Sequence, residues 1–272
     1  MEPVTKHVAK SYRFDHFSDV DRRAEIKRLH LQATVLIDRE VAFLRELGVG
    51  AGQRVLDLGC GPGFIAGAIA ELVAPGETVG VDASAELLGI AQAVVAPEHA
   101  NLRFSSGNAY GTALPDATFD FIYNRLLYQH LSDPLAALRE AKRLLRPGGR
   151  VCVIDVDDAW LTLEPRSEAF DALVALAATA QVKNGGDRHI ARRLPRLMSE
   201  TGFSKVDFRV VAATSLELGL QRFLDITTRF KAQQIGTPEA GALLSQIDQD
   251  VRRHGPEKVF GAVGVFCVVG TR

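Results

Sequence analysis

The chain has 272 residues, of which 47% are hydrophobic and 24% are charged, and its formal net charge is −1. This composition excludes a disordered chain, which combines low hydrophobicity with high net charge. The near-neutral balance also lacks the electrostatic signature of a protein that binds nucleic acid or an anionic membrane. The three cysteines have no metal-ligand spacing, and the first residues form no apolar leader. We therefore expect a cytoplasmic protein without a disulfide framework or a metal.

The first elements form an arm and a helix. Residues 1–19 are polar with interspersed aromatics, which is typical of an arm that packs through a few anchors. From Asp19 to Leu47, apolar residues recur at steps of three and four, which predicts a helix that ends at Gly48. We therefore divide the chain into an arm and cap helix over 1–47 and one α/β domain over 48–272.

An alternation of short strands and helices follows. Strands are predicted at 54–58, 78–81, 102–105, 119–123 and 150–156, with helices at 64–74, 84–95 and 133–145. This rhythm predicts βαβ units and a mostly parallel sheet.

The rhythm is interrupted after the fifth strand. Helices are predicted at 166–183 and 190–201, so that residues 159–198 form an insertion. A strand at 205–212, helices at 216–234 and 238–253, and a last strand at 259–269 complete the chain. The last strand is rich in glycine, which we interpret as close packing against a helix or a neighbouring backbone.

A glycine loop follows the first strand. Gly59, Gly61 and Gly63 lie in the run VLDLGCGPGF, between a buried strand and a helix. Such a loop brings a ligand against main-chain atoms. Asp57 lies at the carboxyl end of this strand, where open α/β sheets bind ligands. Asp82 ends the second strand, where a carboxylate accepts hydrogen bonds from both hydroxyls of a ribose.

Four segments carry a family resemblance across residues 24–158: VLDLGCGPG, VGVDAS, GNAYGTALPDATFDFIYNRLLYQHLSDP and LLRPGGRVCVIDVD. In this order they resemble the class I S-adenosylmethionine-dependent methyltransferases, in particular the small-molecule enzymes related to those of ubiquinone and menaquinone synthesis. The resemblance implies a Rossmann-like seven-stranded sheet of order 3-2-1-4-5-7-6, with the last strand antiparallel and helices on both faces.

The resemblance also implies a set of residues around S-adenosylmethionine. Gly59 and Gly61 would cradle its methionine part, Asp57 would bind near its amino group, and Asp82 would hold the ribose. Asn108 stands where the family usually has an acid beside the adenine. The remaining cofactor-binding candidates are Ala83, Ala109, Asn124, Arg125 and Gln32, the last with the alternative of an ordinary polar helix face.

The acceptor side is less clearly marked. His130 is a candidate general base, with a structural hydrogen bond as the alternative, and Tyr12 of the arm is a candidate catalytic residue that closes over the site, with packing as the alternative. The family places substrate-selecting elements in the insertion over 159–198. The candidate substrate residues are Tyr128, Trp160, His189 and Arg192, with Arg188 a further polar side chain of the insertion; a helix surface explains those of the insertion equally well.

We expect in-line methyl transfer in a closed pocket to an oxygen, nitrogen or carbon atom of a small molecule, such as a secondary metabolite or a quinone-like compound, with no nucleic-acid or membrane partner. A non-catalytic module that binds the cofactor is one alternative. An NAD(P)-dependent oxidoreductase is another, but its loop needs the spacing G-x-G-x-x-G, and Phe64 stands where the third glycine would fall. Asp57 would also repel a pyrophosphate.

Overall fold

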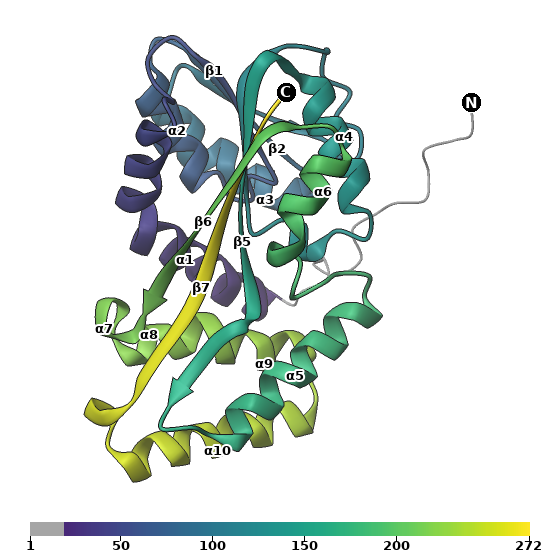
Figure 1. Ribbon diagram of the computed structural model, residues 1–272. Helices are drawn as coiled ribbons and strands as arrows, with labels where there is room; N and C mark the ends of the chain where they lie inside the picture. The colour runs from purple at the N-terminus through teal and green to yellow at the C-terminus, as the bar shows by residue number, and fades with distance from the viewer. Residues whose placement is uncertain (1–18) are drawn as a thin grey trace.

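The computed structural model describes residues 19–272 and has a single sheet at its centre (Figure 1). Seven strands pair in the order β3-β2-β1-β4-β5-β7-β6. The first five are mutually parallel, and β7 is antiparallel to both β5 and β6. The strands are β1 (Arg54–Leu58), β2 (Glu77–Asp82), β3 (Leu102–Ser106), β4 (Phe119–Arg125), β5 (Leu145–Glu164), β6 (Ser204–Thr214) and β7 (Phe260–Thr271). The predicted fold and strand order are confirmed.

Helices cover both faces of the sheet because its central strands are apolar on both sides. Leu44 of α1 and Ile69 of α2 pack on the face that carries Val55. Leu138 of α4 and Leu197 of α6 pack on the opposite face. The helices are α1 (Asp19–Glu46), α2 (Phe64–Val73), α3 (Ala85–Ile90), α4 (Pro134–Leu144), α5 (Glu168–Lys183), α6 (Leu194–Glu200), α7 (Ser215–Leu218), α8 (Leu220–Leu224), α9 (Phe230–Ile235) and α10 (Pro238–His254). None of these helices is both long and apolar enough to cross a membrane.

The end of the fifth strand differs from the prediction. We expected β5 to end at residue 156, but it continues to Glu164 after an irregularity between Val156 and Leu161, where it pairs again with β7. The predicted insertion over 159–198 therefore begins as the outer half of a strand. Its second helix, α6, packs on the main sheet. The division of the chain at residue 47 remains a prediction.

A second core lies below the main sheet. In Figure 1 the strands β5, β6 and β7 extend downward to a layer that contains α5, α8, α9 and α10. Phe170 of α5 and Phe223 of α8 are buried there. Gly261 of β7 lies so close to Phe223 that an added Cβ would be 2.3 Å from the ring. This contact agrees with our interpretation of the glycine-rich strand, and the layer places α9 beside the carboxyl ends of the strands.

Candidate functional site

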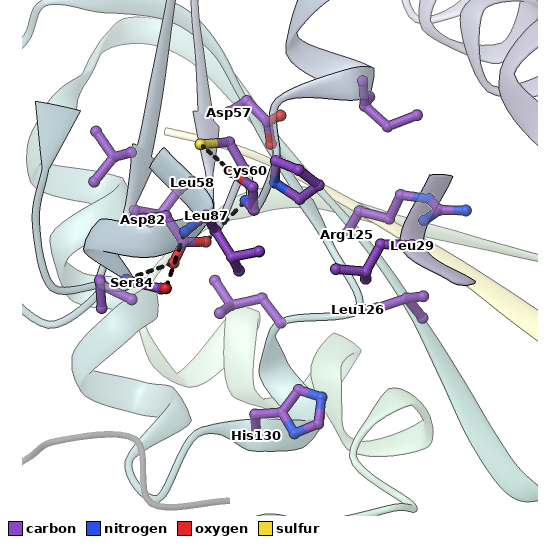
Figure 2. Close-up of a pocket in the computed structure, with 18 of the residues that line it drawn as sticks. Leu29, Asp57, Leu58, Cys60, Asp82, Ser84, Leu87, Arg125, Leu126 and His130 are labelled. Carbon is purple, nitrogen blue, oxygen red and sulfur yellow. Dashed lines mark hydrogen bonds between the residues drawn. The ribbon is translucent and has the colours of Figure 1, made fainter. Parts of the chain in front are cut away.

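A cavity of about 570 Å³ lies at the carboxyl ends of β1, β2 and β4 (Figure 2). The strand order reverses here, since the chain adds β2 and β3 on one side of β1 and then returns to place β4 on the other. Open α/β sheets bind ligands at such a point. The cavity is lined by His130 and by nine of the predicted cofactor residues, namely Gln32, Asp57, Gly59, Gly61, Asp82, Ala83, Asn108, Ala109 and Arg125.

The glycine loop forms the floor of this cavity. Gly59, Gly61 and Gly63 have φ angles of 82°, 52° and 81°, in the left-handed region that favours glycine. The N–H of Gly59 donates to the carbonyl of Val81 at 2.7 Å, which holds the loop against the end of β2. Glycine therefore alternates in the sequence because every second residue of this loop has a left-handed backbone conformation.

Asp82 is fixed between two backbone segments. Its Oδ2 accepts the N–H of Gly61 at 2.8 Å, and its Oδ1 accepts the N–H of Ser84 at 2.9 Å. Figure 2 shows these bonds at one end of the cavity. Each carboxylate oxygen accepts more than one hydrogen bond, so this carboxylate is preorganised to accept further hydroxyl groups. Ser84 also caps α3, accepting the N–H of Leu87 at 3.2 Å.

Asp57 is a buried carboxyl group on the cavity wall. Burial raises its pKa to about 8, the negative charge of Asp82 adds to the rise, and Arg125 opposes it. Its side chain therefore carries a proton near pH 7. A cation bound beside it would restore the charged form, because an opposite charge favours ionisation.

Arg125 connects the first helix to the end of β4. Its Nε donates to Oε1 of Glu40 at 2.8 Å, and its Nη2 donates to the carbonyl of Gln32 at 2.8 Å. Tyr123 donates to the other oxygen of Glu40 at 2.5 Å. These bonds hold α1 over the sheet. Leu126 follows with φ at 52°, which is strained for a residue with a side chain, and its N–H donates to Ile154 at 2.7 Å.

Asn124 does not line the cavity, and its contact with the cofactor stays a prediction. Its side chain is fully buried, and its Nδ2 donates to the carbonyl of Leu58 at 3.0 Å. It therefore holds the end of β1 against β4. Successive side chains of a strand point to opposite faces, so Asn124 and Arg125 cannot both face the cavity.

His130 lies at the opposite end of the cavity from Asp57 and Asp82 (Figure 2). The amide nitrogen of Gln181 donates to the carbonyl of Gln129 at 2.7 Å, which fixes that atom as a donor, and it lies 3.0 Å from Nδ1 of His130. Nδ1 therefore accepts, and Nε2 carries the ring proton. Burial lowers the pKa of His130 to about 3, and Arg188 and Arg28 lower it further. The ring is therefore neutral near pH 7, and the role of His130 as a general base stays a prediction.

The four predicted substrate residues lie outside the cavity. Tyr128 is fully buried in the core beside α4. Trp160 is 54% exposed and contacts Phe266 edge to face, with ring centroids 5.5 Å apart. His189 and Arg192 both bind Asp157, at 3.1 Å and 2.6 Å. None of the four lines the cavity, and their role in binding the substrate stays a prediction.

Tyr12, the predicted catalytic residue of the arm, lies outside the residues that the structure describes.

A smaller cavity of about 80 Å³ adjoins the first and contains residues that the sequence did not single out. Gln32, Arg125, Leu126, Gln129 and Phe230 line both cavities. The smaller one is also lined by Asp158, Arg188 and Lys231. Arg188 was one polar side chain among several in the insertion, and Lys231 carried no signal at all. Within residues 19–272 no group of three or more His, Cys, Asp and Glu side chains could hold a metal ion.

The family follows from comparison with known proteins. A family model described as a methyltransferase domain matches residues 56–153. An uncharacterized 37.1 kDa protein in transposon TN4556 of Streptomyces fradiae is 31% identical, over 94% of this chain and 71% of its own length. The ubiquinone biosynthesis O-methyltransferase of Ruegeria pomeroyi is 35% identical, over 57% of this chain and 63% of its own length. The chain belongs to the class I S-adenosylmethionine-dependent methyltransferases.

The fold is shared with solved members of this methyltransferase family. Phosphoethanolamine N-methyltransferase 2 of Haemonchus contortus, in complex with S-adenosyl-L-methionine, has a TM-score of 0.56 and 19% identity, over 86% of this chain and 52% of that chain. The cofactor of the family is S-adenosylmethionine. The chain spans between about half and two thirds of the length of these two named methyltransferases.

Proposed function

We propose that this protein transfers the methyl group of S-adenosylmethionine to an oxygen, nitrogen or carbon atom of a small molecule, such as a secondary metabolite or a quinone-like compound. The observation that carries the proposal is the convergence of the glycine loop, Asp57 and Asp82 on one cavity at the switch point of the sheet. We place the protein in the cytoplasm on its cysteine usage.

The residues of the cavity fit the cofactor group by group. The glycine loop allows close backbone approach to the methionine part, and the protonated carboxyl of Asp57 is ready to ionise beside an ammonium. The fixed carboxylate of Asp82 would accept both ribose hydroxyls. Asn108 and Ala109 would lie beside the adenine, with the Asn108 amide oxygen in place of the usual acid.

When bound, the cofactor supplies a methyl group on a positively charged sulfur. The chain mainly aligns the acceptor with this methyl group and excludes water from it. Arg125 and Glu40 hold α1 in place as the wall that would exclude water. His130 lines the end of the cavity opposite Asp57 and Asp82, where its neutral ring would lie beside the acceptor.

The experiment is calorimetric titration of the full chain with S-adenosylmethionine and S-adenosylhomocysteine, with NAD and NADP as matched controls. We expect binding of the first two ligands only, at micromolar dissociation constants. A methylated product from a screen of small molecules with labelled cofactor would then establish catalysis. Binding without any product from such a screen would favour a non-catalytic module, and binding of a dinucleotide would overturn the assignment of the loop.

A further inference from the structure

Two cations share one carboxylate in the smaller cavity. Arg188 donates from Nε to Oδ2 of Asp158 at 2.8 Å, and Lys231 Nζ lies 3.3 Å from Oδ1 of the same residue. Arg188 also donates from Nη1 to Oε1 of Gln129 at 2.8 Å. At most 5% of each of these three charged side chains is exposed. The cluster therefore holds two positive charges and one negative charge away from water.

The other charged groups around the cluster do not remove this excess. Glu40 is bound by Arg125 and Tyr123. On the main-cavity side, Arg28 of α1 is paired with Glu25 at 2.7 Å. The nearby Asp155 accepts backbone N–H groups, and burial raises its pKa to about 7 although Arg188 opposes the rise, so near pH 7 it offsets only part of the excess. Among the described residues, Lys231 thus has one carboxylate oxygen as its partner although an ammonium carries three donors.

The geometry around Lys231 favours a ligand with an apolar body and a charged end. Half of the residues that line the smaller cavity are apolar, namely Leu126, Ile154, Val156, Ala213, Ile226, Phe230, Val263 and Val265. Besides the cluster, its polar lining residues are Gln32, Glu40, Arg125, Gln129 and Thr227. Phe230 lies at the junction of the two cavities and stacks under the guanidinium of Arg28 at 3.7 Å. The two cavities therefore adjoin at Phe230, and a molecule in the larger cavity would have to extend one end past this ring to reach Lys231.

We propose that the methyl acceptor is an organic acid whose carboxylate binds Lys231 and Arg188 in the smaller cavity, while its apolar body points the methylated atom toward the cofactor. This inference rests on the proposed function and names its substrate class. An unpaired buried charge is costly, and a carboxylate ligand would add a second negative charge beside Asp158 to the two cations. Discrimination against neutral analogues follows, since a neutral end leaves the excess charge in place.

The test uses simple acids paired with neutral analogues of the same shape. The full chain, saturated with S-adenosylhomocysteine, is titrated with benzoate and benzamide, and with cinnamate and cinnamamide. We expect each acid to bind at least about tenfold more tightly than its amide, the gain of one charge-assisted contact. Lys231→Met, which keeps the length but not the charge, is expected to abolish this preference. Lys183→Met, at an exposed lysine of α5, is the matched control and keeps it.

Three results would overturn the inference. Equal binding of acid and amide to the unaltered protein, or no binding of either ligand at concentrations of tens of millimolar, would show that Lys231 and Arg188 form no carboxylate site. A fall in S-adenosylhomocysteine affinity in Lys231→Met would show that the cluster holds the cofactor's carboxylate. An acid preference that strengthens above pH 8 would exclude the ammonium, because the pKa of Lys231 is lowered to about 8 by burial and by Arg188. Failure of S-adenosylhomocysteine to bind the unaltered protein would instead refute the proposed function.

Discussion

Binding of the cofactor is expected to release a proton from Asp57. The carboxyl is 2% exposed, and its pKa is raised to about 8 by burial and by the charge of Asp82. At pH 7 about nine tenths of the molecules therefore carry this proton in the free protein. An ammonium group placed beside the carboxyl lowers its pKa by about one to three units.

These values give the size of the effect. With the pKa falling from about 8 to between about 7 and 5, binding at pH 7 releases about 0.4 to 0.9 of a proton. Because binding releases a proton from Asp57, the affinity rises with pH up to about pH 8, above which loss of the ligand's own ammonium proton opposes the rise. The measurement is titration calorimetry with S-adenosylhomocysteine in buffers of different ionisation enthalpy, in which the slope of the apparent enthalpy gives the number of protons released.

The control is Asp57→Asn, which keeps the shape of the neutral side chain and cannot ionise. The amino group of the ligand titrates near the same pH, and its contribution persists in this variant. The difference between the two proteins therefore belongs to Asp57. A difference below about 0.2 of a proton would refute the placement of the cofactor's amino group beside this carboxyl, because it would mean that no cation approaches it.

Two further substitutions test the framework of the cavity. Asp82→Ala is expected to weaken S-adenosylhomocysteine binding by roughly a hundredfold or more, because the hydrogen bonds to the ribose are lost. The control Asp133→Ala removes the N-cap of α4 and costs about 1 kcal/mol of stability, but it leaves the calorimetric affinity unchanged. Glu40→Gln leaves Arg125 buried without its counter-charge and is expected to cost about 3 kcal/mol in urea unfolding, whereas Glu46→Gln, in an exposed pair, costs less than about 0.5 kcal/mol. Equal effects within either pair of variants would contradict these roles.

The fold and the cofactor side of the site were predictable because their signals are local. Gly59 and Gly61 lie in one short loop, and the loop conformation requires glycine at both positions. Asp82 follows a buried strand directly, so its place at the edge of the sheet follows from the strand itself. The position of Asn124 outside the cavity has an equally local cause, since neighbouring strand residues face opposite sides and its side chain binds the end of β1.

The acceptor side was not predictable because it is assembled from distant segments. Lys231 reaches the cavity only because β5 and β7 extend beyond the main sheet and carry α9 with them. Trp160 and Arg192 were chosen for their residue types, and both are exposed side chains that contact buried partners away from the cavity, Phe266 and Asp157. Residue type marks a candidate, but burial and pairing decide which candidate meets a ligand.

Membership of the family does not identify the acceptor, because the proposed acceptor residues lie outside the shared domain. The matched methyltransferase domain covers residues 56–153, which hold the glycine loop and Asp82. Asp158, Arg188 and Lys231 all lie beyond it, on elements that continue past the shared sheet. The residues that bind the cofactor can therefore persist in a relative while the charges that would select the acceptor change. A search for the acceptor should consequently start with organic acids, which match the excess positive charge of this cavity, before the substrates of relatives.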